Sequence, residues 1–309
     1  MNSDADTPVL SIVGTTASGK SSIALELARN IPNIEIVSID SMQIYRGMDI
    51  GTAKPTTAER EEISHHLIDI VDPSAEFSLS QFQSEAKKAI SDIERRGAIP
   101  LLVGGTGLHL RAVIDDFEIP RQYPVVGEEL KGEPDTTKLH KLLFSLDPVA
   151  AGRMEETNRR RILRALEVTL GSGRPFSSYG PGLQQYQQTR FQMVGPRWPR
   201  AVINQRIENR FTQQMQDGFL KEVRELTTYG NGLSRTARQA LGYSQFLEYL
   251  DGNVSLDQAI DAAKQQIKKF SKRQERWFRR DPRIQWFDIK ENPLELISTL
   301  VEEWRHASN

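Results

Sequence analysis

The sequence predicts an α/β fold, in which a parallel sheet is flanked by helices and carries a small helical insertion and a helical C-terminal part. In the first third of the chain, short apolar runs alternate with amphipathic segments, as in parallel sheets with crossover helices. A glycine-rich turn follows the first apolar run and leads directly into a helix. After residue 117 this alternation stops, which indicates an insertion.

The first part of the chain supplies three expected strands, Val9–Val13, Glu35–Ile39 and Pro100–Val103, and two expected helices, Ser22–Arg29 and Ser80–Arg96. Each strand is followed by a segment that contains glycine or acidic residues. In open α/β sheets ligands bind beyond the carboxyl ends of the strands. We therefore expect these three segments to converge on one crevice.

Residues 118–190 are predicted to form a small helical domain, inserted into a core made of residues 1–117 and 191–309. Proline and glycine interrupt the first part of this insertion, and helices are expected at Lys138–Leu146 and Asn158–Leu170. The chain then returns to the sheet and becomes mainly helical. The expected elements are a strand at Phe191–Val194, helices at Val202–Tyr229, Ala237–Asp251 and Leu256–Arg280, and a last strand at Ile284–Phe287.

The composition of this chain of 309 residues is ordinary for a globular protein, with 26% charged and 38% hydrophobic residues. It contains no cysteine, which excludes disulfides, thiolate metal sites and a cysteine nucleophile. The acidic start, Met1–Asp6, lacks the pattern of a signal peptide, and no apolar run approaches the ~18 residues of a membrane span. We expect a cytoplasmic protein without membrane contact, and a monomer suffices.

Basic residues are concentrated in two segments, although the formal net charge is only −1. Nine lie between Lys264 and Arg283, where only Glu275 and Asp281 oppose them. The other cluster consists of Arg159, Arg160, Arg161 and Arg164. Such clusters favour a polyanionic partner such as a nucleic acid, and a solvated helix face is the alternative.

The glycine-rich turn reads G-T-T-A-S-G-K-S and matches the phosphate-binding pattern G-x-x-x-x-G-K-[ST] between a strand and a helix. Backbone N–H groups of such a loop converge on a phosphate, Lys20 adds a full charge, and the Ser21 hydroxyl is placed to ligate Mg²⁺. The protein is therefore expected to bind a diphosphate or polyphosphate. The predicted phosphate-binding residues are Gly14, Thr15, Thr16, Ala17, Ser18, Gly19, Lys20 and Ser21.

Asp40 ends the second expected strand and opens the polar run Asp40–Thr56. A carboxylate at this position suits either Mg²⁺ binding or general-base catalysis. The third strand leads into Gly104–Gly107, which offers a hydroxyl and close backbone approach, or simply a tight turn. The histidines lack metal-ligand spacing, so we expect structural or hydrogen-bonding roles for His65, His66 and His109.

The long C-terminal helix is predicted to have two distinct faces. Its apolar residues, Ile267, Phe270, Trp277 and Phe278, fall roughly on one side and are expected to pack in the core. Its basic residues, Lys264, Lys268, Lys272 and Arg276, recur every fourth position along another side. Because this basic side has no expected partner inside the protein, phosphate-backbone binding would explain it.

Together these segments resemble the tRNA dimethylallyltransferase family, also called tRNA isopentenyltransferases. The resemblance covers nearly the whole chain in family order. Because the sequence ends at Asn309 without the zinc-finger extension of eukaryotic members, we expect a bacterial-type member. The sequence departs from the family pattern in four places. Thr15 replaces proline, His109 replaces tyrosine, Glu156–Asn158 replaces Pro-Asn-Asp, and the stretch Ile119–Thr137 is shorter than is typical. The matching segments are Gly14–Ser21, Asp40–Thr56, His65–Asp69, Val103–Leu108, Arg164–Val168, Arg206–Arg210, Gly242–Tyr243 and Lys272–Arg279.

The resemblance implies a P-loop NTPase-like fold and transfer of a dimethylallyl group from dimethylallyl diphosphate to N6 of an adenosine. This adenosine is the one adjacent to the anticodon on its 3′ side, in tRNAs that read codons beginning with U. The P-loop would hold the diphosphate with Mg²⁺ rather than split ATP. Asp40 would be the general base, Thr16 would lie near the bridging oxygen, and Arg210 would reach the terminal phosphate.

The resemblance also implies which residues contact the anticodon stem-loop. Asp40, Ser41, Met42, Gln43 and Thr106 would receive the extruded adenosine. The insertion would contribute Arg160, Arg161, Ile162, Leu163 and Arg164, and the C-terminal part Arg238, Gln239, Ala240, Leu241, Gly242 and Tyr243. On the basic helix, Lys268, Lys272 and Arg276 would bind the RNA backbone.

Three other functions are compatible with parts of the sequence. An adenylate isopentenyltransferase of the cytokinin type would use a free nucleotide, which needs neither the insertion nor the basic helix. A P-loop kinase of small molecules leaves the run Asp40–Thr56 unexplained. An RNA-binding protein with a vestigial nucleotide site is disfavoured because Lys20, Ser21 and Asp40 are all present.

Overall fold

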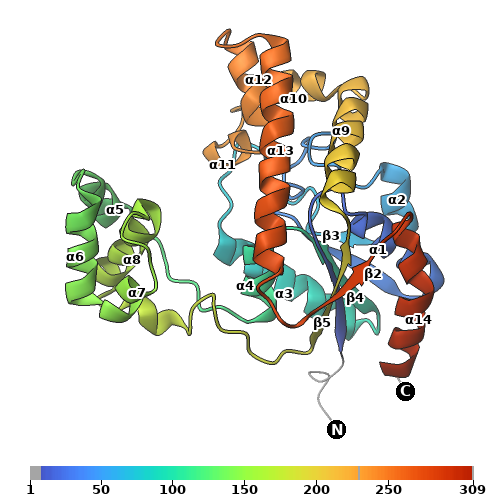
Figure 1. The fold of residues 1–309 in the computed structure, drawn as a ribbon, viewed down its shortest axis with the longest axis horizontal. Coiled ribbons are helices and arrows are strands. Elements are labelled where there is room, and N and C mark those ends of the chain that lie inside the picture. The colour runs from blue at the N-terminus through green and yellow to red at the C-terminus, as the bar shows by residue number, and fades with distance from the viewer. Residues whose placement is uncertain (1–7, 229, 308–309) are drawn as a thin grey trace. The chain divides into compact units, whose positions relative to one another are not determined.

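The computed structural model describes residues 8–228 and 230–307, and it divides into two compact units (Figure 1). The core unit comprises the described residues up to Ile114 and from Gln188 onward. The helical unit comprises Asp115–Gln187. The start of the chain, Met1–Asp6, lies outside the described residues.

The core unit is built on a six-stranded sheet in the order β3-β2-β4-β1-β5-β6, and every neighbouring pair is parallel. All residues of the central strand β1 are buried, as expected for a strand covered on both faces. The predicted parallel sheet is thus confirmed, and a short edge strand adds to it. The strands are β1 (Val9–Val13), β2 (Ile34–Ile39), β3 (His65–His66), β4 (Ile99–Gly104), β5 (Phe191–Arg197) and β6 (Ile284–Asp288).

Helices cover the sheet, and the longest of the core unit, α13, runs alongside α9 and α12 (Figure 1). A 3-10 turn, Pro293–Glu295, precedes the last helix. The helices of the core unit are α1 (Lys20–Asn30), α2 (Thr57–Glu62), α3 (Leu79–Arg95), α4 (Gly107–Ile114), α9 (Arg200–Gln216), α10 (Phe219–Thr228), α11 (Arg235–Arg238), α12 (Tyr243–Leu250), α13 (Leu256–Phe278) and α14 (Leu296–Ala307).

Two of the predicted helices are wrong as single elements. The segment Val202–Tyr229 forms α9 and α10, which separate at Gly218, whose φ of 100° lies in the left-handed region. Ala237–Asp251 likewise divides into α11 and α12 at Gly242, with φ of 86°. Glycine reaches such angles at little cost and ends a helix there, and apolar periodicity does not reveal the break. Tyr229 lies outside the described residues.

The helical unit has its own apolar core, which includes Leu139, Leu143, Ile162 and Leu166. Its two predicted helices are present as α6 and α8. Helix α5 was not predicted, because Pro124 suggests a break, yet proline is well tolerated in the first turn of a helix. The elements are α5 (Pro124–Lys131), α6 (Thr136–Leu146), α7 (Pro148–Gly152), α8 (Arg159–Ser172) and a 3-10 turn at Phe176–Tyr179.

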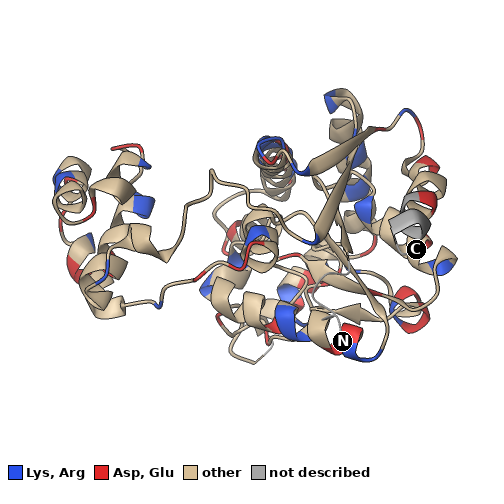
Figure 2. Ribbon diagram, turned by 90° about the horizontal axis from the view of Figure 1, so that it is seen from below, with Lys and Arg blue, Asp and Glu red and all other residues tan. Residues whose placement is uncertain are grey.

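Charges of both signs are interspersed along both units (Figure 2). Within residues 8–228 and 230–307, no helix combines the length and apolarity needed to cross a bilayer.

Candidate active site

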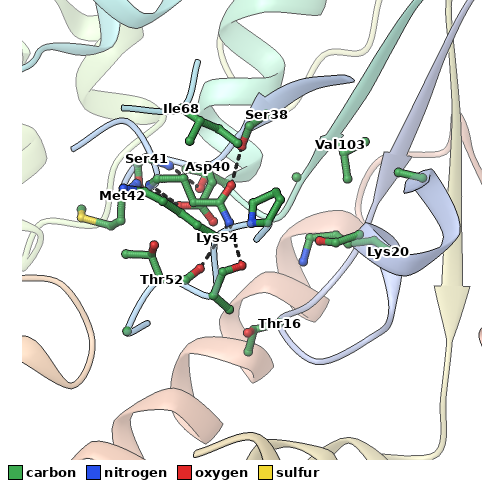
Figure 3. A pocket seen from close by; sticks show the side chains of 18 of the residues that line it. Thr16, Lys20, Ser38, Asp40, Ser41, Met42, Thr52, Lys54, Ile68 and Val103 are labelled. Carbon is green, nitrogen blue, oxygen red and sulfur yellow. Dashed lines mark hydrogen bonds between the residues drawn. The ribbon is translucent and has the colours of Figure 1, made fainter. Parts of the chain in front are cut away.

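The loops that follow β1, β2 and β4 line one pocket of about 640 Å³. This confirms the expected crevice at the carboxyl ends of these strands. Thr16 and Lys20 approach the pocket from the loop after β1, and Asp40 to Met42 approach from the loop after β2 (Figure 3). Further wall residues come from other elements: Ser21, Thr106, Arg210, Gln239, Ala240, Leu241 and Tyr243.

The loop after β1 has the backbone shape of a phosphate-binding loop. Gly19 adopts φ of 91° and caps α1, which begins at Lys20. A Cβ atom at Gly19 would lie 2.7 Å from the Pro293 side chain, so close packing also requires glycine there. The positive end of the α1 dipole is therefore at this loop, where an anion is favoured.

Two side chains from outside the loop hold its carbonyl groups. Arg206 Nε donates to the Ala17 carbonyl at 2.7 Å, and Trp198 Nε1 donates to the Ser18 carbonyl at 2.9 Å. The Arg206 guanidinium also lies over the Trp198 ring, 4.8 Å from its centroid. Sequence reasoning placed Arg206 in a matching motif but assigned a role only to Arg210.

Positive charge is concentrated on the phosphate-loop side of the pocket. Arg210 donates a hydrogen bond to the Thr16 hydroxyl, and Lys20 Nζ donates to the Thr15 carbonyl at 3.2 Å. Burial and the nearby Arg210 lower the pKa of Lys20 to about 8, against the opposite influence of Asp40. Burial also lowers the pKa of Arg210. Because two cations lie close together, an anion bound here would be strongly favoured.

Asp40 supplies a carboxylate on the other side. Its Oδ1 accepts hydrogen bonds from Met42 N at 2.8 Å and Gln43 N at 3.3 Å, an Asx-type turn that fixes the side chain. No described residue donates a hydrogen bond to Oδ2. The held carboxylate therefore keeps one oxygen available to a proton on a ligand in the pocket.

The wall beside Asp40 is tied together by side-chain hydrogen bonds. The buried Gln43 amide accepts from the Ser38 hydroxyl at 2.8 Å and donates to the Thr52 and Ala53 carbonyls at 3.2 Å each. The Thr106 hydroxyl accepts from Ser41 N at 3.3 Å. Gln43 thus lines the pocket and is also held by hydrogen bonds to Ser38, Thr52 and Ala53.

Glu222 is a buried carboxylate that sequence reasoning missed. It accepts hydrogen bonds from the backbone N–H groups of Asp49, Ile50 and Gly51, at 2.7 to 3.0 Å, and from the Tyr243 hydroxyl at 2.6 Å. Burial and the neighbouring Glu222 raise the pKa of Tyr243 well above its usual value. The Tyr243 hydroxyl is thus engaged with Glu222 inside the protein, and the contact of Tyr243 with RNA stays a prediction. No local sequence signal marks Glu222.

The basic side of α13 is not wholly free, contrary to the expectation. Lys264 pairs with Glu208 of α9 at 3.1 Å, and Lys268 pairs with the same carboxylate. Lys272 and Arg276 are exposed and form no ion pair with any residue that the structure describes. Only these two of the three predicted contacts on this helix present an unpaired charge.

The predicted contacts in α8 also differ in accessibility. Arg160 and Arg161 are exposed, whereas the Ile162 side chain is fully buried in the core of the helical unit. Arg164 pairs with Glu167 at 2.8 Å, and Leu163 packs against the same core. The Ile162 side chain therefore packs inside the unit, and the contact of Ile162 with RNA stays a prediction.

The histidines have structural surroundings. His65 bonds a backbone carbonyl, His66 lies 2.6 Å from a Glu35 carboxylate oxygen, and His109 packs edge-on against the Phe82 ring. Burial lowers the pKa of His109 to about 4. Across residues 8–228 and 230–307, no three or more His, Cys, Asp or Glu side chains are grouped so that they could hold a metal ion.

Two family models and many curated relatives match the sequence of this chain. The IPP transferase model matches residues 43–281, and the isopentenyl transferase model matches residues 7–72. The chain is 44% identical over 296 residues to the tRNA dimethylallyltransferase of Carboxydothermus hydrogenoformans, covering 94% of each. It is 43% identical to that of Pseudarthrobacter chlorophenolicus, covering 93% of this chain and 95% of the relative.

Solved structures are similar to this chain over more than nine tenths of its length. The tRNA isopentenylpyrophosphate transferase of Bacillus halodurans matches with a TM-score of 0.70 and 37% identity, covering 98% of both chains. A eukaryotic dimethylallyltransferase acting on tRNA matches with a TM-score of 0.75 and 28% identity, covering 91% of this chain and 73% of the other. From the pocket and these similarities together, the chain belongs to the IPP transferase family, the tRNA dimethylallyltransferases.

Proposed function

We propose that this enzyme transfers a dimethylallyl group from dimethylallyl diphosphate to N6 of the adenosine adjacent to the anticodon, on its 3′ side. The tRNAs are those that read codons beginning with U. One observation carries the proposal: a single pocket has clustered cations on one side and a held carboxylate on the other. The first side suits an anionic leaving group, and the second suits an acceptor that must lose a proton.

The diphosphate occupies the side formed by the loop after β1. Lys20, Arg210 and the N-terminal end of α1 stabilise the charge that develops as the allylic C–O bond breaks and its electron pair leaves with the diphosphate. The Thr16 hydroxyl, held by Arg210, lies at the bridging oxygen. Arg210 itself reaches the terminal phosphate.

The acceptor side deprotonates a weak nucleophile. The lone pair of an adenine amine is delocalised into the ring, so the amine gains reactivity when a base removes its proton. Asp40 takes this proton on Oδ2 while the bond from N6 to the allylic carbon forms. Its Oδ1 stays with Met42 N and Gln43 N, which keeps the carboxylate in place.

The donor set also fits Mg²⁺. This ion is usually held by one or two protein oxygens together with phosphate oxygens, so it does not require a cage of side chains. The Ser21 hydroxyl lines the pocket directly after Lys20 and is the residue that would hold it. A bound Mg²⁺ would neutralise charge on the departing diphosphate.

The RNA is bound by exposed basic residues and by a pocket rim that receives the base. The target adenosine leaves the anticodon stack, which costs a few kcal/mol. Gln239 and Leu241 line the pocket, and exposed Arg238 precedes them. Arg160 and Arg161 of the helical unit contact the anticodon stem-loop as well.

A transfer assay tests the proposal. Radiolabelled dimethylallyl diphosphate is incubated with Mg²⁺ and either unmodified tRNA or AMP, without ATP. Label at the adenosine beside the anticodon is the expected result. Label in AMP alone would indicate the cytokinin-type enzyme. If neither acceptor is labelled and ATP is consumed in a parallel reaction, the kinase alternative replaces the proposal.

A further inference from the structure

Gln274 lies on the buried side of α13 and is only 7% exposed. Its Oε1 accepts a hydrogen bond from Thr16 N at 2.8 Å, and its Nε2 donates to the Gly105 carbonyl at 2.8 Å. One carboxamide therefore satisfies two backbone groups that belong to different loops of the pocket. Neither group forms part of a regular helix or strand.

The glycine-rich loop after β4 is shaped to receive this side of α13. A Cβ atom at Gly105 would lie 2.5 Å from Gln274 Nε2, and one at Gly107 would lie 2.1 Å from the Trp277 ring. Gln274 and Trp277 are three residues apart, so they lie on one face of the helix. These two glycines thus leave room for the side chains of α13. The close approach to the loop backbone that the sequence predicts is therefore made by this helix.

The two loops joined by Gln274 serve opposite halves of the proposed reaction. Thr16 belongs to the leaving-group side, where its hydroxyl accepts from Arg210. Gly105 precedes Thr106, whose hydroxyl accepts from Ser41 N beside Asp40. The Gln274 side chain thus links the loop on the diphosphate side to the loop that contacts the Asp40 side.

We propose that Gln274 is a positioning residue for prenyl transfer. It fixes the position of the loop that contains Thr16 relative to Thr106 and Asp40. This inference rests on the roles proposed for Thr16 and Asp40. A neutral amide suits the task because it accepts from an N–H and donates to a carbonyl at once. Glutamate cannot donate when ionised, and methionine offers neither bond.

The test is Gln274→Met, which has a similar length and removes both hydrogen bonds. We expect kcat to fall about 10²-fold, because small misplacement of reacting groups has effects of this size. The Kd for tRNA should stay within about twofold, since Gln274 is buried away from the basic surface of α13. Gln265→Met, at an exposed position of the same helix, is the matched control and should transfer at the wild-type rate.

A double-mutant cycle with Thr16→Ala separates positioning from a general loss of structure. If Gln274 acts through Thr16, Gln274→Met should reduce kcat much less in the Thr16→Ala background. An equal fold-loss in both backgrounds would overturn the inference, as would wild-type kcat in Gln274→Met. Absence of transfer by the wild-type enzyme would instead overturn the proposed function.

Gln274→Glu keeps the test decisive if Gln274→Met does not fold. This variant retains the side-chain shape and the acceptor for Thr16 N, but its ionised form cannot donate to the Gly105 carbonyl. We expect a reduced kcat with a melting temperature close to that of the wild type. A folded Gln274→Glu enzyme with unchanged kcat and unchanged KM for dimethylallyl diphosphate would contradict the positioning role.

Discussion

Lys20 and Asp40 carry opposite charges into the same pocket, yet their surroundings differ. Lys20 has lost much of its hydration and lies near Arg210, and both effects disfavour its charged form. Asp40 has one oxygen held by two backbone N–H groups and the other available to a ligand. At the scale of residues, the pocket therefore places cations opposite a carboxylate that is held in one orientation.

Asp40→Asn tests the base directly. Asparagine keeps an oxygen for Met42 N and Gln43 N but cannot accept the proton, so turnover should fall by about 10²–10⁴. Binding of tRNA should remain nearly intact, as measured by filter binding. Asp40→Ala, which also removes the turn, serves for comparison. If Asp40→Asn turns over at the wild-type rate, Asp40 is not the base.

The pKa of Lys20 predicts the pH dependence of substrate capture. In the free enzyme Lys20 is charged below about pH 8 and becomes neutral above it. Because the charged form attracts the diphosphate, kcat/KM for dimethylallyl diphosphate should decrease as the pH rises through about 8. A profile between about pH 6 and about pH 10 measures this. A flat profile up to the alkaline end would contradict the assignment.

Helix α13 has two sides with different surroundings. Gln274 and Trp277 dock it on the loop after β4, and Lys272 and Arg276 remain exposed. Lys268 belongs to neither group, because it shares an ion pair to Glu208 with Lys264. The helix thereby joins a basic surface to the loops of the pocket.

Charge reversal at the two exposed positions tests the RNA surface. The double variant Lys272→Glu/Arg276→Glu should bind tRNA more weakly, and the slope of log K against log salt should decrease by about one for each lost phosphate contact. Lys88→Glu, at an exposed position of α3, is the control and should change neither quantity. Unchanged affinity and slope in the double variant would show that this face is only solvated.

Helix α10 fastens the turn at residues 49–51 through Glu222. Glu222→Gln replaces a carboxylate that accepts four hydrogen bonds with an amide that has one acceptor oxygen. Each buried donor left unsatisfied costs about 1–3 kcal/mol, so we expect a lower stability in urea and faster hydrogen exchange at Asp49–Gly51. Glu225→Gln, exposed on the same helix, should behave as wild type. Unaltered exchange in Glu222→Gln would contradict this role.

At the scale of the whole molecule, the described residues form two separate apolar cores, one for each unit. Separate cores are expected to unfold with some independence. Leu143 is fully buried in the helical unit, so Leu143→Ala should destabilise that unit by about 2–5 kcal/mol. Hydrogen exchange should increase within Asp115–Gln187 and remain unchanged in the sheet. Equal loss of protection in β1 would show that the units unfold as one.

Much of the fold was predictable because it depends on local patterns. Apolar runs located β1, β2, β4, β5 and β6, and the phosphate-loop pattern located the carboxyl edge of the sheet. The breaks at Gly218 and Gly242 were not predictable, because each depends on a backbone conformation that packing selects. Helix α5 was missed because proline has different effects at the start and in the middle of a helix.

The sequence by itself determined the chemical groups of the site, since Gly14–Ser21, Asp40 and Thr106 follow strands whose carboxyl ends meet at one edge. It also determined the family, through motifs spread over nearly the whole chain. Only the tertiary structure decided which residues hold those groups. Gln274, Glu222 and Arg206 act over separations of 169 to 258 residues, 171 to 173 residues and 189 residues, and no local pattern encodes such contacts. The same packing decided which basic residues remain free, because a charge on α13 is available to RNA only where no carboxylate faces it.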